Sequence, residues 1–320
     1  MTQNAFNPRI LSYEAAIGQL NWTEAVEALR QGHTLPRAEI RDVFLGPPDA
    51  TMMSRSAHIA GLGYGAKTFT VFDANAGRGL PTVQGAMLVF DKDSGSPTAI
   101  VDSRLVTEIK TAADSVLGAS LLARPDSRHL LVVGAGTVAT SLVKAYTAVM
   151  PGIKRVSVWS RRPEQAQSLI DGMPGISAEL VAVADLRDAV GQADIVTSAT
   201  MARQPVILGD WVRPGTHVDL IGAFKADMRE ADDALIAGAA LFVDSRATTL
   251  GHIGELMMPI ASGAITPDSV LGDLYDLVRP DARRRLSDDE ITLYKNGGGA
   301  HLDLMIALWI ARVMARVTAG

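Results

Sequence analysis

The sequence has 320 residues, a formal net charge of −5 at pH 7 and no cysteine. Its length exceeds the size at which one hydrophobic core stops growing, so we expect two domains. An acidic chain is a poor match for nucleic acid or an anionic membrane, because both favour a basic surface. The absence of cysteine excludes disulfides, thiolate nucleophiles and zinc–sulfur sites. With no signal peptide and no membrane-spanning stretch in the pattern, we expect a cytoplasmic protein.

The first third of the sequence predicts a helix followed by short strands. Asn21 is a candidate N-cap with Glu24 three residues later, and Gly32 is placed to end the helix. Runs rich in β-forming residues follow without intervening helices, at 51–54, 66–72, 83–90 and 98–101. A turn at 91–95 joins two of them as a hairpin. This rhythm predicts an antiparallel sheet in an α+β substrate domain.

From Thr107 the pattern becomes helical to about Ala123. Strand candidates then alternate with helical lengths, at 130–133, 155–159, 180–183, 195–198, 217–221 and 241–243. This alternation predicts an α/β fold with a parallel, doubly wound Rossmann sheet. A long apolar helix begins at Ala300, and we expect it to return to the N-terminal domain or a subunit interface. The predicted domains are a discontinuous substrate and dimerisation domain, 1–115 with 300–320, and a dinucleotide-binding domain, 116–299.

A glycine motif follows the first strand of that alternation. Gly134 permits a tight turn, Gly136 lets the backbone approach a pyrophosphate, and Ala139 keeps helix and strand close. The helix N-terminus adds amide donors and a positive dipole. The motif sits between a strand and a helix, so it predicts dinucleotide binding at Gly134, Gly136, Thr137 and Val138.

The end of the second strand carries Ser160, Arg161 and Arg162, where NAD enzymes usually have an acid that binds the ribose. A hydroxyl and two guanidinium groups suit a 2′-phosphate, so NADP(H) is the preferred cofactor and NAD(H) the alternative. The other interpretation is a solvated pair of arginines at the start of a helix. No metal site is predicted, because His252 and Glu255 lack a third ligand and the H-E-x-x-H pattern.

Several segments together resemble the ornithine cyclodeaminase/mu-crystallin family of homodimeric NAD(P)-dependent enzymes, over nearly the whole chain. They are Lys67, 75–82, 106–113, 134–136, Gly222 with Glu230, 254–255 and 296–303. The resemblance implies a substrate and dimerisation domain formed by the N-terminal part and the final helix. It also implies an arginine on an early strand, a lysine and a second arginine that hold the substrate carboxylate.

Arg41 and Lys67 match the first two of these positions, but the third is Lys110. A guanidinium group, which can bind a carboxylate through two parallel hydrogen bonds, is therefore replaced by the single ammonium of a lysine. The geometry of carboxylate binding and the substrate must then differ from those of the cyclodeaminases. For each cation, the alternative is a structural or surface ion pair. The catalytic Asp of the cyclodeaminases corresponds to Phe224, which cannot accept a proton, and Asp227 is a poor substitute. Ornithine cyclisation is thus not expected, and hydride exchange at a carbon–nitrogen bond remains.

The favoured hypothesis is an NAD(P)H-dependent reductase of cyclic ketimine carboxylates, which makes L-proline or L-pipecolate from Δ1-pyrroline-2-carboxylate or Δ1-piperideine-2-carboxylate. Lys67 is the expected catalytic residue, and His301 is either a ligand contact or a packing histidine. The expected substrate-binding residues are Arg41, Lys67, Lys110, Thr82 and Phe224. The cofactor-binding set adds Thr111, Ser160, Arg161, Arg162, Thr200, Asn296 and Gly297 to the glycine motif. The alternatives are an open-chain L-amino acid dehydrogenase of the alanine dehydrogenase type, an ornithine cyclodeaminase, and a mu-crystallin-like binding protein without activity.

Overall fold

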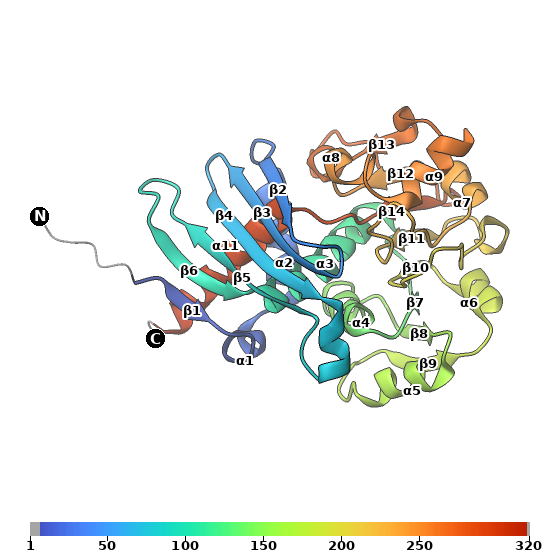
Figure 1. Cartoon of the computed structure of the whole chain (residues 1–320). Helices are drawn as coiled ribbons and strands as arrows, with labels where there is room; N and C mark the ends of the chain where they lie inside the picture. The colour runs from blue at the N-terminus through green and yellow to red at the C-terminus, as the bar shows by residue number, and fades with distance from the viewer. Residues whose placement is uncertain (1–6, 319–320) are drawn as a thin grey trace, which may run out of the picture. The chain divides into compact units, whose positions relative to one another are not determined.

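The computed structural model describes residues 7–318, which divide into two compact units (Figure 1). Unit 1 comprises residues 7–110 and 299–318, and unit 2 comprises residues 111–298. Helix α3 (Ser103–Leu122) contributes residues to both units. Within residues 7–318, no helix is long and apolar enough to cross a membrane.

Unit 1 is built on a six-stranded sheet with the order β1-β6-β5-β4-β3-β2. Its strands are β1 (Arg9–Leu11), β2 (Glu39–Leu45), β3 (Ala50–Ile59), β4 (Gly63–Phe72), β5 (Val83–Phe90) and β6 (Pro97–Asp102). The predicted antiparallel pairing and the hairpin at 91–95 are confirmed, but β1 pairs with β6 in parallel. The sheet is therefore mixed at one edge, and its two edge strands were not predicted.

Two helices of unit 1 pack together through a glycine. Helix α2 (Trp22–His33) begins as predicted, because the Asn21 side chain accepts hydrogen bonds from the backbone N–H groups of Thr23 and Glu24. Gly32 does not end the helix, which was the expectation. A Cβ atom there would lie 2.4 Å from the Met305 Sδ atom of α11 (Ala300–Val317), so the glycine permits close helix packing. Helix α11 covers the sheet of unit 1 and is almost fully buried along its first half.

Unit 2 is built on an eight-stranded sheet, all parallel, with the order β13-β12-β14-β11-β10-β7-β8-β9. Its strands are β7 (His129–Val133), β8 (Arg155–Trp159), β9 (Glu179–Val183), β10 (Ile195–Ser198), β11 (His217–Leu220), β12 (Ala240–Val243), β13 (Val270–Gly272) and β14 (Thr292–Lys295). The predicted α/β fold with a Rossmann sheet is confirmed. The strand order reverses beside β7, which is where such sheets bind dinucleotides. Strands β13 and β14 were missed.

The remaining elements are short helices that connect these strands. In unit 1 they are α1 (Tyr13–Ala16), η1 (Ile17–Gln19) and η2 (Asp73–Arg78). In unit 2 the α-helices are α4 (Thr137–Val149), α5 (Pro163–Asp171), α6 (Leu186–Gln192), α7 (Asp233–Gly238), α8 (Arg246–Thr249), α9 (Gly254–Ser262) and α10 (Leu274–Leu277). Two 3-10 turns complete it, η3 (Gly209–Trp211) and η4 (Pro267–Ser269). Figure 1 shows helices on both faces of the parallel sheet of unit 2.

Candidate functional site

The glycine motif forms the turn between β7 and α4. Gly134 has a φ angle of +123°, and a Cβ atom there would lie 2.8 Å from the Ala199 carbonyl oxygen. Both facts require glycine. Gly136 is the N-cap of α4, and a Cβ atom there would meet no other atom within 4 Å. No side chain caps this helix, so the N–H groups of its first turn, which begins with Thr137 and Val138, are left for a ligand. The turn therefore fits a dinucleotide pyrophosphate.

Ser160 and the two arginines lie where β8 ends and α5 begins. Ser160 is buried, and its Oγ atom accepts a weak hydrogen bond of 3.4 Å from the backbone N–H of Arg162. Arg161 and Arg162 are exposed, and no hydrogen bond or ion pair to another residue of the range 7–318 holds either guanidinium group. Both groups are therefore available to an anionic ligand at this strand end.

Glu230 joins the loops that follow β10 and β11. Its fully buried carboxylate accepts hydrogen bonds from Ser198 Oγ, from the Thr200 backbone N–H and Oγ1, and from the N–H groups of Gly222 and Ala223. The distances are 2.6 to 3.3 Å. In a Rossmann sheet, ligands bind at the carboxyl ends of the strands, so Glu230 shapes two of the loops that would hold the cofactor. Thr200, a predicted cofactor contact, lies in the first of these loops.

A second carboxylate supports Glu230 from behind. Glu255 is fully buried and accepts hydrogen bonds from the backbone N–H groups of Glu230 and Ala231, at 2.8 and 2.9 Å. Burial raises the pKa of Glu255, and the buried ammonium of Lys295 acts in the opposite direction. Lys295 itself donates to the Leu220 carbonyl at 2.8 Å. Glu230 and Glu255 belong to the segments that carry the family resemblance, but no local sequence pattern shows that their carboxylates accept hydrogen bonds from backbone amides.

Phe224 and Asp227 follow the second of these loops. The Phe224 side chain is 51% exposed within this single chain. Asp227 is also exposed and forms an ion pair with Arg203 at 2.9 Å. Its carboxylate is therefore already paired with an arginine of unit 2, and its exclusion as a replacement for the missing catalytic acid stays a prediction.

Predicted cofactor residues also meet at the end of β14. Asn296 Nδ2 donates to the Thr111 carbonyl at 3.1 Å and to Ser115 Oγ at 3.0 Å. The backbone N–H groups of Gly297 and Gly298 donate to Asp244 Oδ2. The strand end is thus fixed to α3 on one side and to the buried Asp244 carboxylate on the other, and a cofactor role for Thr111, Asn296 and Gly297 stays a prediction.

Unit 1 holds a buried group of charges around Lys67. The Lys67 side chain is 6% exposed, and its ammonium donates hydrogen bonds to Asp303 Oδ1, at 3.1 Å, and to Thr107 Oγ1. Burial lowers the pKa of Lys67, the charge of Lys110 lowers it further, and Asp303 opposes both. Burial alone would raise the pKa of Asp303, but the neighbouring cations, Lys67 first, hold it below its usual value. The predicted Lys67 and Lys110 therefore lie together, and Asp303 is a partner that the sequence analysis did not assign.

Asp303 and His301 complete this group. The second carboxylate oxygen of Asp303 is buried and has no hydrogen-bond partner among residues 7–318. His301 is fully buried and packs edge-on against His33, with 5.7 Å between the ring centroids. Burial lowers the pKa of His301 well below its usual value, so the ring is neutral. The packing interpretation of His301 accounts for these contacts.

Arg41 lies on the other face of the sheet. Directly paired residues of antiparallel strands point to the same face, and Arg41 is in line with Ser56 and Ala66. Lys67 is one position further along β4, so its side chain points to the opposite face. Arg41 borders a surface cavity of about 390 Å³ there, with Tyr64 among its neighbours. The structure of unit 1 therefore does not bring Arg41 together with Lys67 and Lys110.

Thr82 is the last residue of the segment 75–82, which is one of the segments that carry the family resemblance. Its carbonyl accepts a hydrogen bond from the Phe72 N–H at 2.9 Å, and its side chain is half-buried. Asn75 is buried and donates to the Pro81 carbonyl at 3.0 Å. Asn75 therefore closes the loop by this hydrogen bond. This structural role accounts for an asparagine at position 75 without any contact to a ligand.

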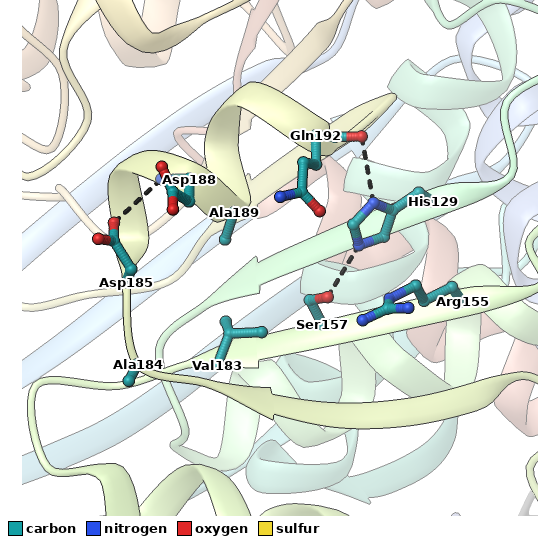
Figure 2. Close-up of a pocket in the computed structure, with 9 residues that line it drawn as sticks. All are labelled: His129, Arg155, Ser157, Val183, Ala184, Asp185, Asp188, Ala189 and Gln192. Carbon is teal, nitrogen blue, oxygen red and sulfur yellow. Dashed lines mark hydrogen bonds between the residues drawn. The ribbon is translucent and has the colours of Figure 1, made fainter.

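A further cavity of about 230 Å³ lies in unit 2 (Figure 2). It is formed by His129, Arg155, Ser157, Val183, Ala184, Asp185, Asp188, Ala189 and Gln192. The His129 ring bonds to Ser157 Oγ at 2.8 Å and to the Gln192 carbonyl at 3.2 Å. None of the predicted site residues lines this cavity, so it is separate from the glycine turn.

The comparisons with known proteins agree with this arrangement. The chain is 81% identical over 315 residues to a Δ(1)-pyrroline-2-carboxylate reductase of Paracoccus denitrificans, covering 98% of this chain and 100% of the relative. Its fold matches the structure of the Thermococcus litoralis Δ(1)-pyrroline-2-carboxylate reductase in complex with NADH and L-proline. The TM-score is 0.90 at 25% identity, with 97% and 98% of the two chains covered. An archaeal alanine dehydrogenase dimer with bound NAD matches with a TM-score of 0.89, also at 25% identity, over 98% of each chain.

The family itself follows from a match that spans most of the sequence. Residues 47–316 fit the model of the ornithine cyclodeaminase/mu-crystallin family. This range includes the glycine turn, the Glu230 loops and the buried lysines described above. The chain belongs to the ornithine cyclodeaminase/mu-crystallin family.

Proposed function

We propose that this protein is a nicotinamide-dependent reductase of cyclic ketimine carboxylates, which converts Δ1-pyrroline-2-carboxylate or Δ1-piperideine-2-carboxylate to L-proline or L-pipecolate. The observation that carries the proposal is the pair of buried lysines, Lys67 and Lys110, with Asp303 paired to Lys67 and under the electrostatic influence of both. Two ammonium groups and one carboxylate leave a positive charge, which suits the carboxylate of an imino acid. The high identity to a reductase of this type supports the same substrate class.

The chemical role of each residue follows from its environment. The glycine turn and the Glu230 loops would hold a reduced nicotinamide cofactor, which would supply the hydride when bound. Lys110 binds the substrate carboxylate. Lys67 also binds this carboxylate, and its ammonium keeps a proton near the imine nitrogen. Because burial lowers the pKa of Lys67, its ammonium gives up a proton more easily than an exposed lysine. Asp303 keeps the ammonium in place. Fixing the carboxylate selects the face of the imine that receives hydride.

A substrate panel tests this proposal. Each cyclic imino acid is added to the protein with NADH or NADPH, and the loss of nicotinamide fluorescence is followed. We expect rapid oxidation of the nicotinamide cofactor with a cyclic imino acid of at least one ring size. Reductive amination of pyruvate should be slower, whereas an alanine dehydrogenase would favour pyruvate. L-Ornithine should release no ammonia, because Phe224 stands where cyclodeaminases have an acid. Tight binding of imino acids without turnover would instead favour a binding protein.

The preferred cofactor of the proposed enzyme is NADPH. Arg161 and Arg162 are exposed and unpaired within the described chain, next to the buried Ser160. Arg161→Ala should raise the KM for NADPH by about tenfold or more and leave the KM for NADH nearly unchanged. The reason is that only NADPH has a 2′-phosphate with which the Arg161 guanidinium group can interact. Arg155→Ala is the matched control, since Arg155 begins β8 at the end opposite to Arg161. Equal changes in both KM values for Arg161→Ala would contradict the phosphate assignment.

We further propose that the protein is a cytoplasmic homodimer. Among residues 7–318, edge strand β2 has no strand partner on its outer side, and its Val43, Phe44 and Leu45 are 50%, 62% and 55% exposed. Such an edge is usually covered by another chain or protected by charges. The dimer of the archaeal alanine dehydrogenase supports a second copy as the cover.

A further inference from the structure

We propose that Arg55, rather than Arg41, provides the guanidinium group that holds the substrate carboxylate beside Lys67. This inference rests on the proposed function, since it concerns the same imino acid substrate. The resemblance to the family assigns an arginine of an early strand, and the local pattern around Arg41 in β2 fits that position. The structure of unit 1 places a different arginine, on β3, next to the lysine.

The strand register places Arg55 beside Lys67. Arg55 of β3 is paired directly with Lys67 of β4 and with Asp42 of β2. Directly paired residues share a face and lie close to one another, so these three side chains form one row across the sheet. Arg41 belongs to the neighbouring row and points to the opposite face. A substrate that touches Lys67 can therefore reach Arg55 on the same face, but Arg41 lies behind the sheet.

The Arg55 guanidinium group keeps hydrogen-bond donors that no described residue uses. Its Nε and Nη2 atoms both lie near one oxygen of Asp42, at 3.0 and 2.9 Å. A guanidinium group has a second edge, formed by Nη1 and the remaining hydrogen of Nη2. No residue in the range 7–318 accepts a hydrogen bond from that second edge. Asp42 thus orients the guanidinium group, and a carboxylate can still bind to its free edge in bidentate fashion.

The charged groups around Lys67 carry a net positive charge. The row and its neighbours contain the cations Arg55, Lys67 and Lys110 and the carboxylates Asp42 and Asp303. Three positive and two negative charges leave one positive charge in a largely buried place. The Arg55 side chain is only 19% exposed, so water screens this charge incompletely. A monocarboxylate substrate would neutralise it, and Arg55 would supply the bidentate fork that the change to Lys110 removes.

The experiment compares substrate and cofactor binding in three variants. For Arg55→Met we expect the KM for the cyclic imino acid to rise about tenfold or more, with L-proline binding weakened equally, because a hydrogen-bonded ion pair is lost. The KM for the reduced nicotinamide and the melting temperature should stay near those of the wild type. Arg55→Lys should restore part of the affinity, since it keeps the charge but not the fork. Arg30→Met, which removes an arginine paired with Glu27 on α2, is the matched control.

The outcomes separate this inference from the proposed function. If the wild type reduces the imino acid and Arg55→Met keeps its affinity for both imino acid and L-proline, Arg55 is not a substrate residue. If Arg41→Met raises the imino acid KM more than Arg55→Met does, the arginine of β2 holds the carboxylate and the inference is wrong. A parallel loss of imino acid affinity, nicotinamide affinity and melting temperature in both Arg55 variants would mean a structural role. Failure of the wild type to reduce any cyclic imino acid would instead refute the proposed function.

Discussion

Lys67→Met is expected to lower kcat/KM for cyclic imino acids by on the order of a hundredfold. The substitution removes both the charge that positions the carboxylate and the proton near the imine nitrogen, and a small misplacement of the reacting carbon is enough for a loss of this size. Lys67→Arg should recover substrate binding better than turnover, because a guanidinium group keeps its proton near neutral pH. Steady-state kinetics with each variant, at saturating NADPH, would measure both effects.

The buried ion pair requires a second variant in this experiment. Lys67→Met leaves the Asp303 carboxylate buried without its cation, and this change alone can cost about 3–5 kcal/mol of stability. The double variant Lys67→Met/Asp303→Asn removes both charges and should melt closer to the wild type, yet remain equally inactive. Lys92→Met, in the exposed hairpin of unit 1, is the control for loss of a lysine. Near-native turnover in either Lys67→Met variant would make Lys67 structural.

Parts of this molecule could be predicted from local pattern alone. Gly134 and Gly136 lie between a buried strand and a helix, and their conformations depend on neighbours close in sequence, apart from Ala199. The strands that flank them are runs of apolar residues, because a parallel sheet is buried on both faces. Asn21 was also predicted correctly, since an N-cap bonds to amides two and three residues later.

Other parts depend on long-range pairing that no local pattern contains. Strand β2 mixes charged and apolar residues, so it was missed, and with it the register that decides whether Arg41 or Arg55 faces Lys67. A shift of one residue would reverse that answer. Glu230 reaches back across 30 residues to Thr200, which a sequence motif does not reveal. Strand β14 was missed because it is short and enters the sheet between β11 and β12, out of chain order.

Gly222→Ala should disrupt the two loops that Glu230 joins. A Cβ atom at Gly222 would lie 1.9 Å from the Thr200 carbonyl oxygen, 2.3 Å from the Thr200 nitrogen and 2.7 Å from a carboxylate oxygen of Glu230. Two of these atoms belong to the backbone, so the loops must move apart, and the hydrogen bonds from Thr200 and Gly222 to Glu230 must lengthen. We expect a loss of about 3 kcal/mol or more in the free energy of unfolding.

The same movement should weaken the cofactor site. Because these loops follow β10 and β11 at the carboxyl edge of the sheet, a shift of about 1 Å there can cost on the order of a hundredfold in kcat. Gly238→Ala is the matched control, since a Cβ atom at the end of α7 meets no atom within 4 Å and should change stability by at most about 1 kcal/mol. Urea unfolding and fluorescence titration with NADPH would measure both variants. If Gly222→Ala unfolds and binds NADPH like Gly238→Ala, the loops are not held in the way that the Glu230 contacts require, and their role in placing the cofactor is wrong.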